Sequence, residues 1–386
     1  MNLNEYFDPI NIGDLRQKHI DPKFQLIKEI SVHTVNNPIT NIDDYDIAII
    51  GVVDDDQSNI NNSTQGLNKI RESLYSLSSF DKKTQIYDLG NIKNGKSESD
   101  NIIGLRDVLV ELIAFQVMPV VLGSSEKIIY PNYLAYKQLD QKINLINIDS
   151  NISIVENREK SYKSPLWKIL IDDNESLFSY INIGYQTHFV PGKIIKYLSE
   201  NLHNYYRLGY IRSRIKDVEP IFRDADCIGL NISSIRQSEA FGQTNPSPNG
   251  YYGEEICQLA RYAGMSPKLS SFGVFDYLHS IDLNNQTAHL IAQIVWYFIN
   301  GYISRVPEYP LDSSEHYKKF IVNLDTFEYE LIFYKSEKTD RWWMEVPSFK
   351  LDQFKNLLIS CTLDDYRNAG NGDVPERWLK AFQKIN

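Results

Sequence analysis

Short apolar runs alternate along the chain with longer stretches in which apolar residues recur every three or four positions. The runs predict buried strands at residues 85–89, 118–122, 145–149, 178–184, 206–209, 227–232 and 270–275. The periodic stretches predict helices at 66–77, 102–115, 133–139 and 287–303. Strands and helices in alternation favour the α/β class, here three αβα layers around a mostly parallel sheet.

Both ends of the chain depart from this alternation. Residues 1–44 have little periodicity and predict an extended N-terminal arm, which leaves 45–306 for the α/β domain. After Pro307 and Pro310, residues 307–386 predict a small α+β extension. Its strands are expected at 319–324, 328–334 and 342–346, with a turn at 325–326, and its helices at 351–359 and 375–385. Its many large aromatic side chains suit either a core of its own or a partner-binding face.

Polar residues follow three of the predicted strands. The segments read Leu122-Gly123-Ser124-Ser125-Glu126, Asp149-Ser150-Asn151-Ile152-Ser153 and Gly229-Leu230-Asn231-Ile232-Ser233. Ligands of open α/β sheets bind at the carboxyl ends of the strands. We therefore expect Glu126, Asp149, Asn231 and Ser233 to line one pocket.

These segments, with others in the same order along the chain, resemble the arginase/agmatinase/formimidoylglutamase (ureohydrolase) family. The other segments are Asn62, Gly66 and Ile70-Arg71, Asp88-Leu89-Gly90-Asn91-Ile92, Ser234-Ile235-Arg236-Gln237-Ser238-Glu239-Ala240 and Gly273-Val274-Phe275-Asp276-Tyr277. The resemblance covers about residues 45–305 and is strongest to formimidoylglutamase-like members. It implies the arginase fold.

The resemblance also implies where a metal site would lie. In this family Gly-Gly-x-His, Asp-x-His-x-Asp and Ser-x-Asp-x-Asp segments hold two Mn²⁺ ions. Here Asp149 keeps its type, while Asn151 and Ser153 stand in the His and second Asp positions. Glu126 falls near the first His, and Asn231 and Ser233 replace the last two Asp residues. Glu254 or Glu255 falls where the family has a substrate-contacting Glu.

The remaining charges do not balance such a cluster. Two Mn²⁺ ions carry four positive charges and prefer carboxylate and imidazole ligands. Asp149 and Glu126 supply at most two negative charges, and uncompensated charge in a partly buried site is strongly disfavoured. We therefore expect no metal cofactor. Simpler roles are open to both residues, since Asp149 can cap a turn and Glu126 can sit at a helix start.

The composition of the chain limits the classes of partner and the cellular compartment that we expect. The formal net charge of −10 argues against nucleic acid or an anionic membrane. No segment has the apolar length of a membrane span, and residues 1–18 do not resemble a signal peptide. The three cysteines are far apart, as expected in a reducing compartment, so we expect a cytoplasmic protein.

Three functions are compatible with this sequence. The first is a non-catalytic binding or assembly protein that meets a protein partner, or a second copy of itself, through the aromatic C-terminal extension. The alternative is a formimidoylglutamase- or agmatinase-type hydrolase of a guanidino or formimino C–N bond, with a site rebuilt from Glu126, Asp149 and Glu255. The third is a metal-free sensor that holds a guanidinium or amidinium group against Asp149 and Glu255.

Overall fold

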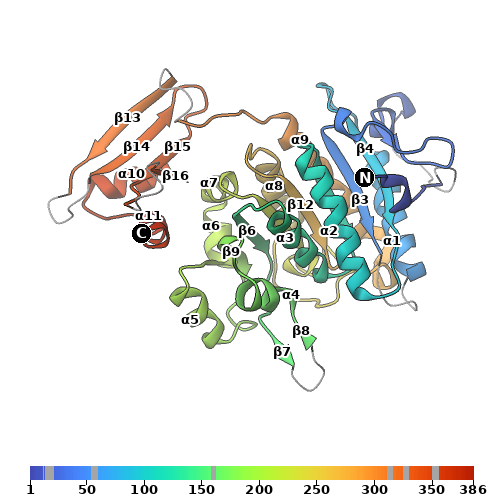
Figure 1. The fold of residues 1–386 in the computed structure, drawn as a ribbon, viewed down its shortest axis with the longest axis horizontal. Coiled ribbons are helices and arrows are strands. Elements are labelled where there is room, and N and C mark those ends of the chain that lie inside the picture. Colours follow the sequence, from blue (N-terminus) through green and yellow to red (C-terminus); the bar gives the residue numbers. More distant parts are fainter. Residues whose placement is uncertain are drawn as a thin grey trace.

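The structure is a computed structural model, and it describes residues 1–11, 13, 21–53, 60–157, 162–310, 316–324, 330–349 and 356–386. Its larger part is a mostly parallel sheet between helices (Figure 1). Among the described residues this sheet has ten strands: β1 (Phe7–Asp8), β2 (Ile30–Val32), β3 (Ile47–Val52), β4 (Ile86–Ile92), β5 (Met118–Gly123), β6 (Ile143–Ile148), β9 (Leu177–Tyr185), β10 (Asn204–Arg207), β11 (Cys227–Asn231) and β12 (Ser271–Phe275).

The strand order is β1-β4-β3-β5-β12-β11-β6-β9-β10, with β2 also paired to β4. Every one of these pairs is parallel except β1 with β4. The central strands β5, β12, β11 and β6 are far apart in sequence and adjacent in the sheet. Their carboxyl ends therefore meet at one edge, where loops from four parts of the chain converge.

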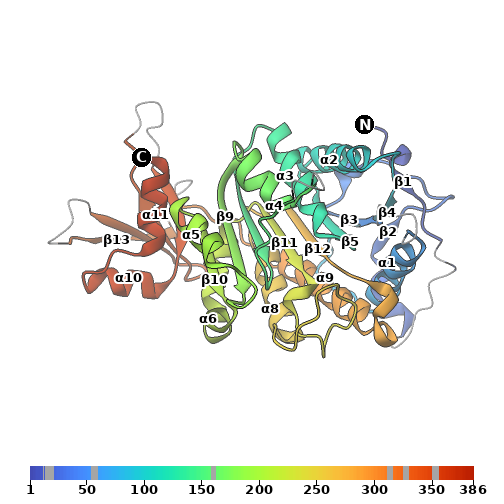
Figure 2. The same cartoon turned by 90° about the horizontal axis from the view of Figure 1, so that it is seen from below.

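Helices cover both faces of the sheet, as Figure 2 shows. One face carries α2 (Glu98–Ala114), α3 (Ile129–Gln138), α4 (Pro165–Trp167) and α5 (Gly192–Glu200). The other carries α1 (Ile60–Tyr75), α6 (Leu208–Ser213), α7 (Val218–Arg223), α8 (Gly253–Gly264) and α9 (Gln286–Ile303). A short two-stranded sheet, β7 (Glu156–Asn157) with β8 (Tyr162–Lys163), follows β6 in the chain.

The alternation of side chains along each strand explains the two layers. In β3, Ile47 and Ile49 belong to one hydrophobic cluster, and Ala48 and Ile50 to the other. Strands buried on both faces lack the polar alternation of an exposed sheet and appear as continuous apolar runs. The predicted fold class is therefore confirmed, and so are the strands and helices of its centre.

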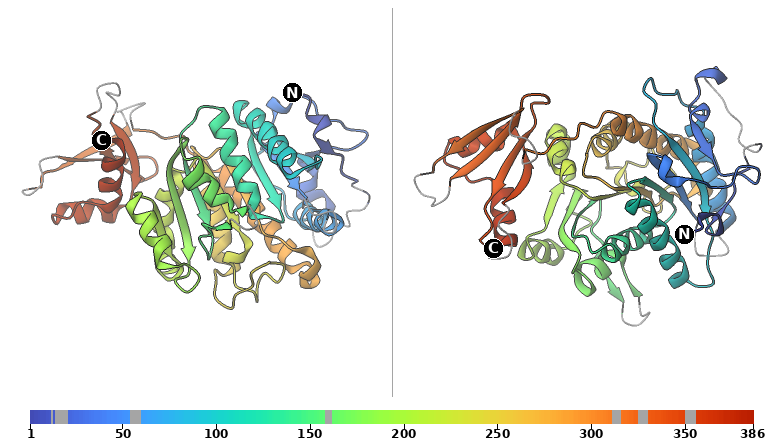
Figure 3. Two further views of the ribbon diagram at one scale, coloured as in Figure 1. Left: turned by 60° about the horizontal axis from the view of Figure 1, so that its bottom comes forward. Right: turned by 45° about the horizontal axis from the view of Figure 1, so that its top comes forward.

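The C-terminal module comprises the antiparallel strands β13 (Tyr317–Val322), β14 (Leu331–Ser336), β15 (Trp342–Val346) and β16 (Leu357–Cys361), with α10 (Leu363–Gly370) and α11 (Glu376–Ile385). It lies beside β9 and β10, at one end of the large sheet (Figure 3). Phe333, Trp342 and Trp378 are buried in its own core. Trp343 is buried against the Arg223 guanidinium of α7, 4.4 Å from the ring centre. These aromatic side chains therefore pack inside the protein and are not exposed to a partner.

Several local predictions need correction. The helix expected at 351–359 is wrong where the structure describes it, because residues 357–361 form strand β16, whose backbone pairs with β15. The strand expected at 206–209 begins at Asn204 and gives way to helix α6 at Leu208. The N-terminal arm contains β1 and β2, two short strands that pair with β4. Helix α10 was missed, and the turn expected at 325–326 lies outside the described residues.

Of the helices in the described part of the chain, none combines the length and the apolar character needed to cross a membrane.

Candidate functional site

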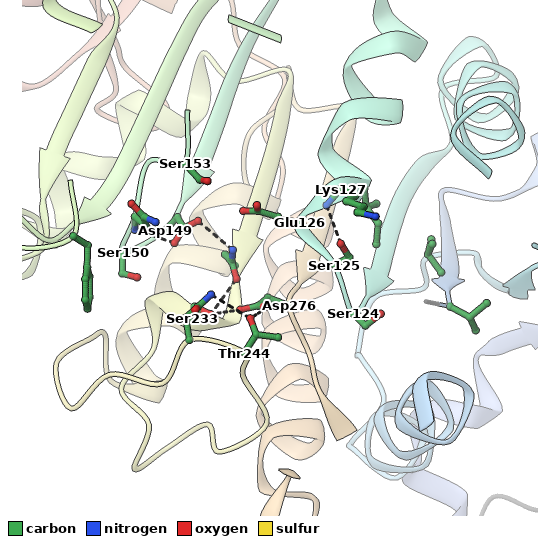
Figure 4. A pocket seen from close by; sticks show the side chains of 17 residues that line it. Ser124, Ser125, Glu126, Lys127, Asp149, Ser150, Ser153, Ser233, Thr244 and Asp276 are labelled. Carbon is green, nitrogen blue, oxygen red and sulfur yellow. Dashed lines mark hydrogen bonds between the residues drawn. The ribbon is translucent and has the colours of Figure 1, made fainter. Parts of the chain in front are cut away.

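A cavity of about 530 Å³ opens at the carboxyl ends of β5, β6, β11 and β12 (Figure 4). Its lining brings together six of the residues singled out from the sequence: Glu126, Asp149, Asn151, Ser153, Asn231 and Ser233. Five of the other lining residues carry hydroxyl or amide side chains, and Val52, Val53 and Ile128 form an apolar side. Phe189, 41 % exposed, also lines the cavity, and the exposed His188 lies against it with ring centres 4.2 Å apart.

Asp149 lies at the floor of this cavity and is 5 % exposed. It follows β6 directly, and its Oδ1 accepts a hydrogen bond from the backbone N–H of Asn151 at 3.1 Å. Its Oδ2 accepts one from Nδ2 of Asn231 at 3.1 Å. The first bond is the turn-capping role considered from the sequence, and it does not remove Asp149 from the cavity. Burial raises its pKa to about 7, and the nearby Glu126 and Asp276 carboxylates add to the rise.

Glu126 reaches the cavity because β5 ends at Gly123 and a short 3-10 turn, Glu126–Ile128, follows. The hydroxyl of Ser125 caps this turn by accepting a hydrogen bond from the N–H of Lys127 at 3.2 Å. A Cβ at Gly123 would lie 2.1 Å from the Cδ1 of Ile128, so a larger residue there would force the Ile128 side chain to move where the strand turns into the site. Burial, and then the charge of Asp276, raise the pKa of Glu126.

A third carboxylate, Asp276, completes the floor. It follows β12 and has a φ of +69°, a region that aspartate and asparagine tolerate better than most residues. Its two oxygens accept hydrogen bonds from the hydroxyls of Ser233 and Thr244. Burial raises its pKa, and these hydroxyls offset part of the rise.

Asp276 is not among the site residues predicted from the sequence, where its segment serves only as one of those that resemble the family. The signal was available, because Asp276 ends a parallel strand in the same way as Asp149. The sequence instead predicts Glu255 as the third acidic residue of the site.

The predicted position of Glu255 needs correction. It lies in the first turn of α8, where Oε2 accepts a hydrogen bond from the N–H of Tyr252 at 2.9 Å and caps the helix. Its Oε1 binds Nε of Arg212 at 2.9 Å. Glu254, its neighbour, is likewise absent from the residues that line the cavity. Helix capping and ion pairing account for Glu255, so neither the rebuilt hydrolase site nor the sensor site receives its carboxylate from this residue.

The donor atoms of the cavity do not suit a binuclear manganese cluster. In the described residues, no group of three or more His, Cys, Asp or Glu side chains is placed to hold a metal ion. The oxygens of Asp149 and Asp276 accept internal hydrogen bonds, and Oδ1 of Asn151 accepts one from the N–H of Ile152 at 2.7 Å. Oδ1 of Asn231 accepts one from the N–H of Ser233 at 3.3 Å. Apart from Glu126, the potential ligands are thus either neutral or already accept hydrogen bonds from protein donors.

No family model matches the chain. The formimidoylglutamase of Staphylococcus aureus (strain MSSA476) is 24% identical over 245 residues, which cover 61% of this chain and 78% of that protein. The structure of formimidoylglutamase from Bacillus subtilis matches with a TM-score of 0.65 at 19% identity, over 76% of this chain and 97% of that one. Trypanosoma cruzi formiminoglutamase with Mn²⁺ matches with a TM-score of 0.62 at 17% identity, over 69% and 97%. These findings confirm the resemblance and the arginase-type fold.

Proposed function

We propose that this chain, a relative of the formimidoylglutamases with the arginase fold, binds a small organic cation in its carboxylate-floored cavity and does not carry out manganese-dependent hydrolysis. The observation that carries the proposal is the composition of the cavity floor. Asp149, Glu126 and Asp276 converge there, while neutral side chains stand at four positions where the family pattern has metal ligands.

The charge of the cavity selects the ligand. Three carboxylates and one ammonium group, that of Lys127, line it, and Lys127 already pairs with Glu98 at 3.2 Å. The raised pKa values of Asp149 and Glu126 mean that ionisation of these buried carboxyl groups is unfavourable without a bound cation. A guanidinium or amidinium group would offset this penalty and donate hydrogen bonds to the carboxylates. The carbon skeleton of such a ligand would lie against Val52, Val53 and Phe189.

Hydrolysis of a guanidino or formimino bond by the family route needs water activated by metal ions. The donor set described above does not supply the ligands for two Mn²⁺ ions. None of the three carboxylates has an imidazole in the cavity lining with which to share a proton. Binding without turnover is therefore the activity that the residues support.

A second candidate is a hydrolase that acts on a formimino or guanidino C–N bond. The names of the relatives support it more directly than they support a non-catalytic protein, since those relatives are formimidoylglutamases. It requires a site built from Glu126, Asp149 and Asp276, which are the acidic side chains on the cavity floor.

One set of measurements separates the two candidates. Purified protein is dialysed against excess Mn²⁺, and its metal content is measured by elemental mass spectrometry. Agmatine, arginine and formiminoglutamate are then tested for binding by calorimetry and for release of urea or formamide. Saturable binding of a guanidinium compound, lost in Asp149→Asn, with less than a tenth of a manganese ion per chain and no turnover, supports the proposal. Metal-dependent turnover overturns it and establishes the hydrolase.

Association with a protein partner is a separate part of the proposal. The buried aromatic side chains of the C-terminal module leave its outer strand β13, with Ile321 53 % exposed, as the surface for such a contact. Light scattering after size-exclusion chromatography tests self-association: a mass that falls to that of one chain in Ile321→Lys supports contact through β13, and a mass unaffected by the change refutes it.

A further inference from the structure

Helix α11 packs against the β9–β10 end of the large sheet (Figure 2). A second cavity, of about 90 Å³, lies between them. Residues of both parts line it, among them Phe178 and Asn204 from the sheet and Arg377, Lys380 and Lys384 from α11. The lining of this cavity differs from that of the carboxylate-floored cavity, because three basic residues line its helix side.

The three basic residues recur at intervals of three and four positions, so α11 presents them on one face. Arg377 has a carboxylate partner, Asp365, with Nε and Oδ2 3.5 Å apart, and it donates to the carbonyl of Ser360 at 3.0 Å. Lys380 pairs with Glu376 at 2.9 Å and donates to Oδ1 of Asn204 at 3.0 Å.

Lys384 differs from these two. Its Nζ donates to the carbonyl of Phe178 at 3.0 Å, and no carboxylate of the described residues lies within ion-pair distance of it. Burial, and then the charge of Lys380, lower its pKa to about 8. An ammonium group that is withdrawn from water beside a second cation is unfavourable without a counter-charge.

The acidic residue in the cavity lining does not supply that counter-charge. Asp224 accepts hydrogen bonds from the backbone N–H of Ser360 at 2.9 Å and from its hydroxyl at 2.6 Å. The carboxylate of Asp224 is therefore bound to strand β16 of the module. Asp224 also does not appear among the groups that shift the pKa of Lys384.

We propose that the cavity between α11 and the β9–β10 edge binds a small oxyanion, a carboxylate or a phosphate, through the ammonium group of Lys384, with the positive charge of Lys380 beside it. A volume of about 90 Å³ equals roughly three water molecules in the liquid, which suits an ion of this size. The bound anion would join the last helix of the chain to the sheet. Because such an ion binds the folded protein only, it would raise the stability of the module's attachment.

The experiment uses the full chain. Thermal unfolding is followed at pH 7 with increasing sodium phosphate, sodium acetate or sodium chloride at one constant ionic strength, and affinity is measured by calorimetry. The variant is Lys384→Gln, with Lys384→Arg as the charge-preserving variant. Lys318→Gln is the matched control, because Lys318 is an exposed lysine of the same module whose side chain is 65 % accessible.

Phosphate or acetate should raise the melting temperature of the unchanged protein and of Lys318→Gln saturably, and chloride should not. Lys384→Gln should weaken the affinity at least tenfold, and Lys384→Arg should keep most of it. A response to phosphate alone identifies a tetrahedral anion, and a response to acetate alone identifies a carboxylate. Equal responses to all three salts, or an unchanged response in Lys384→Gln, overturn the proposal. If Lys384→Gln does not fold, Lys380→Gln takes its place with the same expected loss.

Discussion

At the scale of single residues, Asp149 is the side chain whose ionisation matters most. It is 5 % exposed, and two other carboxylates lie near it, Glu126 after β5 and Asp276 after β12. Its position could be predicted from the sequence, because an acidic residue directly after an apolar strand lies at the binding edge of a parallel sheet. The same signal was present for Asp276, which directly follows β12, but the position of Glu255 could not be predicted, because it depends on the path of the long loop between β11 and α8.

Replacing Asp149 by asparagine should stabilise the empty protein at high pH. The pKa of Asp149 is about 7 in the folded protein, against an ordinary value of 3.8, so the folded form binds a proton more readily than the unfolded chain between these values. Its contribution to stability is therefore greatest at low pH and is lost as pH rises toward 7. Urea unfolding at pH 8 should show a gain on the order of 2 kcal/mol for Asp149→Asn, and the gain should shrink at pH 5. A loss of stability at both pH values would contradict the raised pKa.

The affinity for a cationic ligand should increase with pH, whereas the contribution of Asp149 to stability decreases with pH. A guanidinium compound needs ionised carboxylates, so binding should strengthen as pH rises from 6 to 8 through the pKa of Asp149. Calorimetric titration with agmatine across this range measures the effect. Affinity that is flat with pH would show that Asp149 does not contact the cation.

Arg71 and Asp88 form a buried ion pair that holds α1 against β4. Nε and Nη2 of Arg71 donate to the two carboxylate oxygens at 2.9 and 3.1 Å, and the Tyr75 hydroxyl donates at 2.8 Å. Arg71→Met would leave Asp88 charged and buried, so it should cost about 3–5 kcal/mol in urea unfolding. Lys69→Met, on the same helix but in the more exposed pair with Glu72, should cost less than about 1 kcal/mol.

At the scale of elements, the long periodic segments of the core were predictable and β16 was not. Its residues contain apolar positions at helical spacing when taken with the preceding segment, which favours a helix. In the fold, its backbone completes a sheet and Ser360 donates to Asp224 of the core. A local pattern does not contain these two long-range contacts, which decide the structure.

Helix α11 depends on Trp378, which is fully buried. Its ring stacks on Phe382 with centres 5.0 Å apart, and its Nε1 donates to the carbonyl of Glu345 at 2.8 Å. Trp378→Ala should remove about 3–5 kcal/mol from the module and make residues 307–386 sensitive to protease before the core is. Leu363→Ala, where the side chain is 39 % exposed, is the control and should leave the cleavage pattern unchanged.

At the scale of the whole molecule, the order of the segments along the chain was sufficient to predict the fold, although no single segment was. Collinear landmarks from about residue 45 to 305 correspond to strands that assemble as β4-β3-β5-β12-β11-β6-β9. The same arrangement brings Glu126, Asp149, Asn231 and Ser233 into one cavity. What the sequence could not supply is the attachment of the C-terminal module, which depends on largely buried ion pairs such as Arg341 with Glu219, 3.1 Å apart.

The scaffold should accept a metal site if the ligands are supplied. The combined variant Glu126→His, Asn151→His, Ser153→Asp, Asn231→Asp and Ser233→Asp restores the residue types of the family pattern at these strand ends. We expect it to retain one to two Mn²⁺ ions per chain after dialysis, roughly the family stoichiometry, because added carboxylates and imidazoles balance the ionic charge. Equal metal content in the variant and the unchanged protein would show that side-chain type does not control metal binding here.

In the part of the chain that the structure describes, strand β10 ends the large sheet and is paired on one side only, with β9. An edge of this kind is a template on which another chain can add a strand and begin to aggregate. The lysines of α11 donate to the carbonyls of Phe178 and His203, at 3.0 and 3.4 Å, and so occupy acceptors close to that edge. We therefore expect the C-terminal module to shield this edge, and a chain cut after residue 306 to present an open template to every other copy of itself.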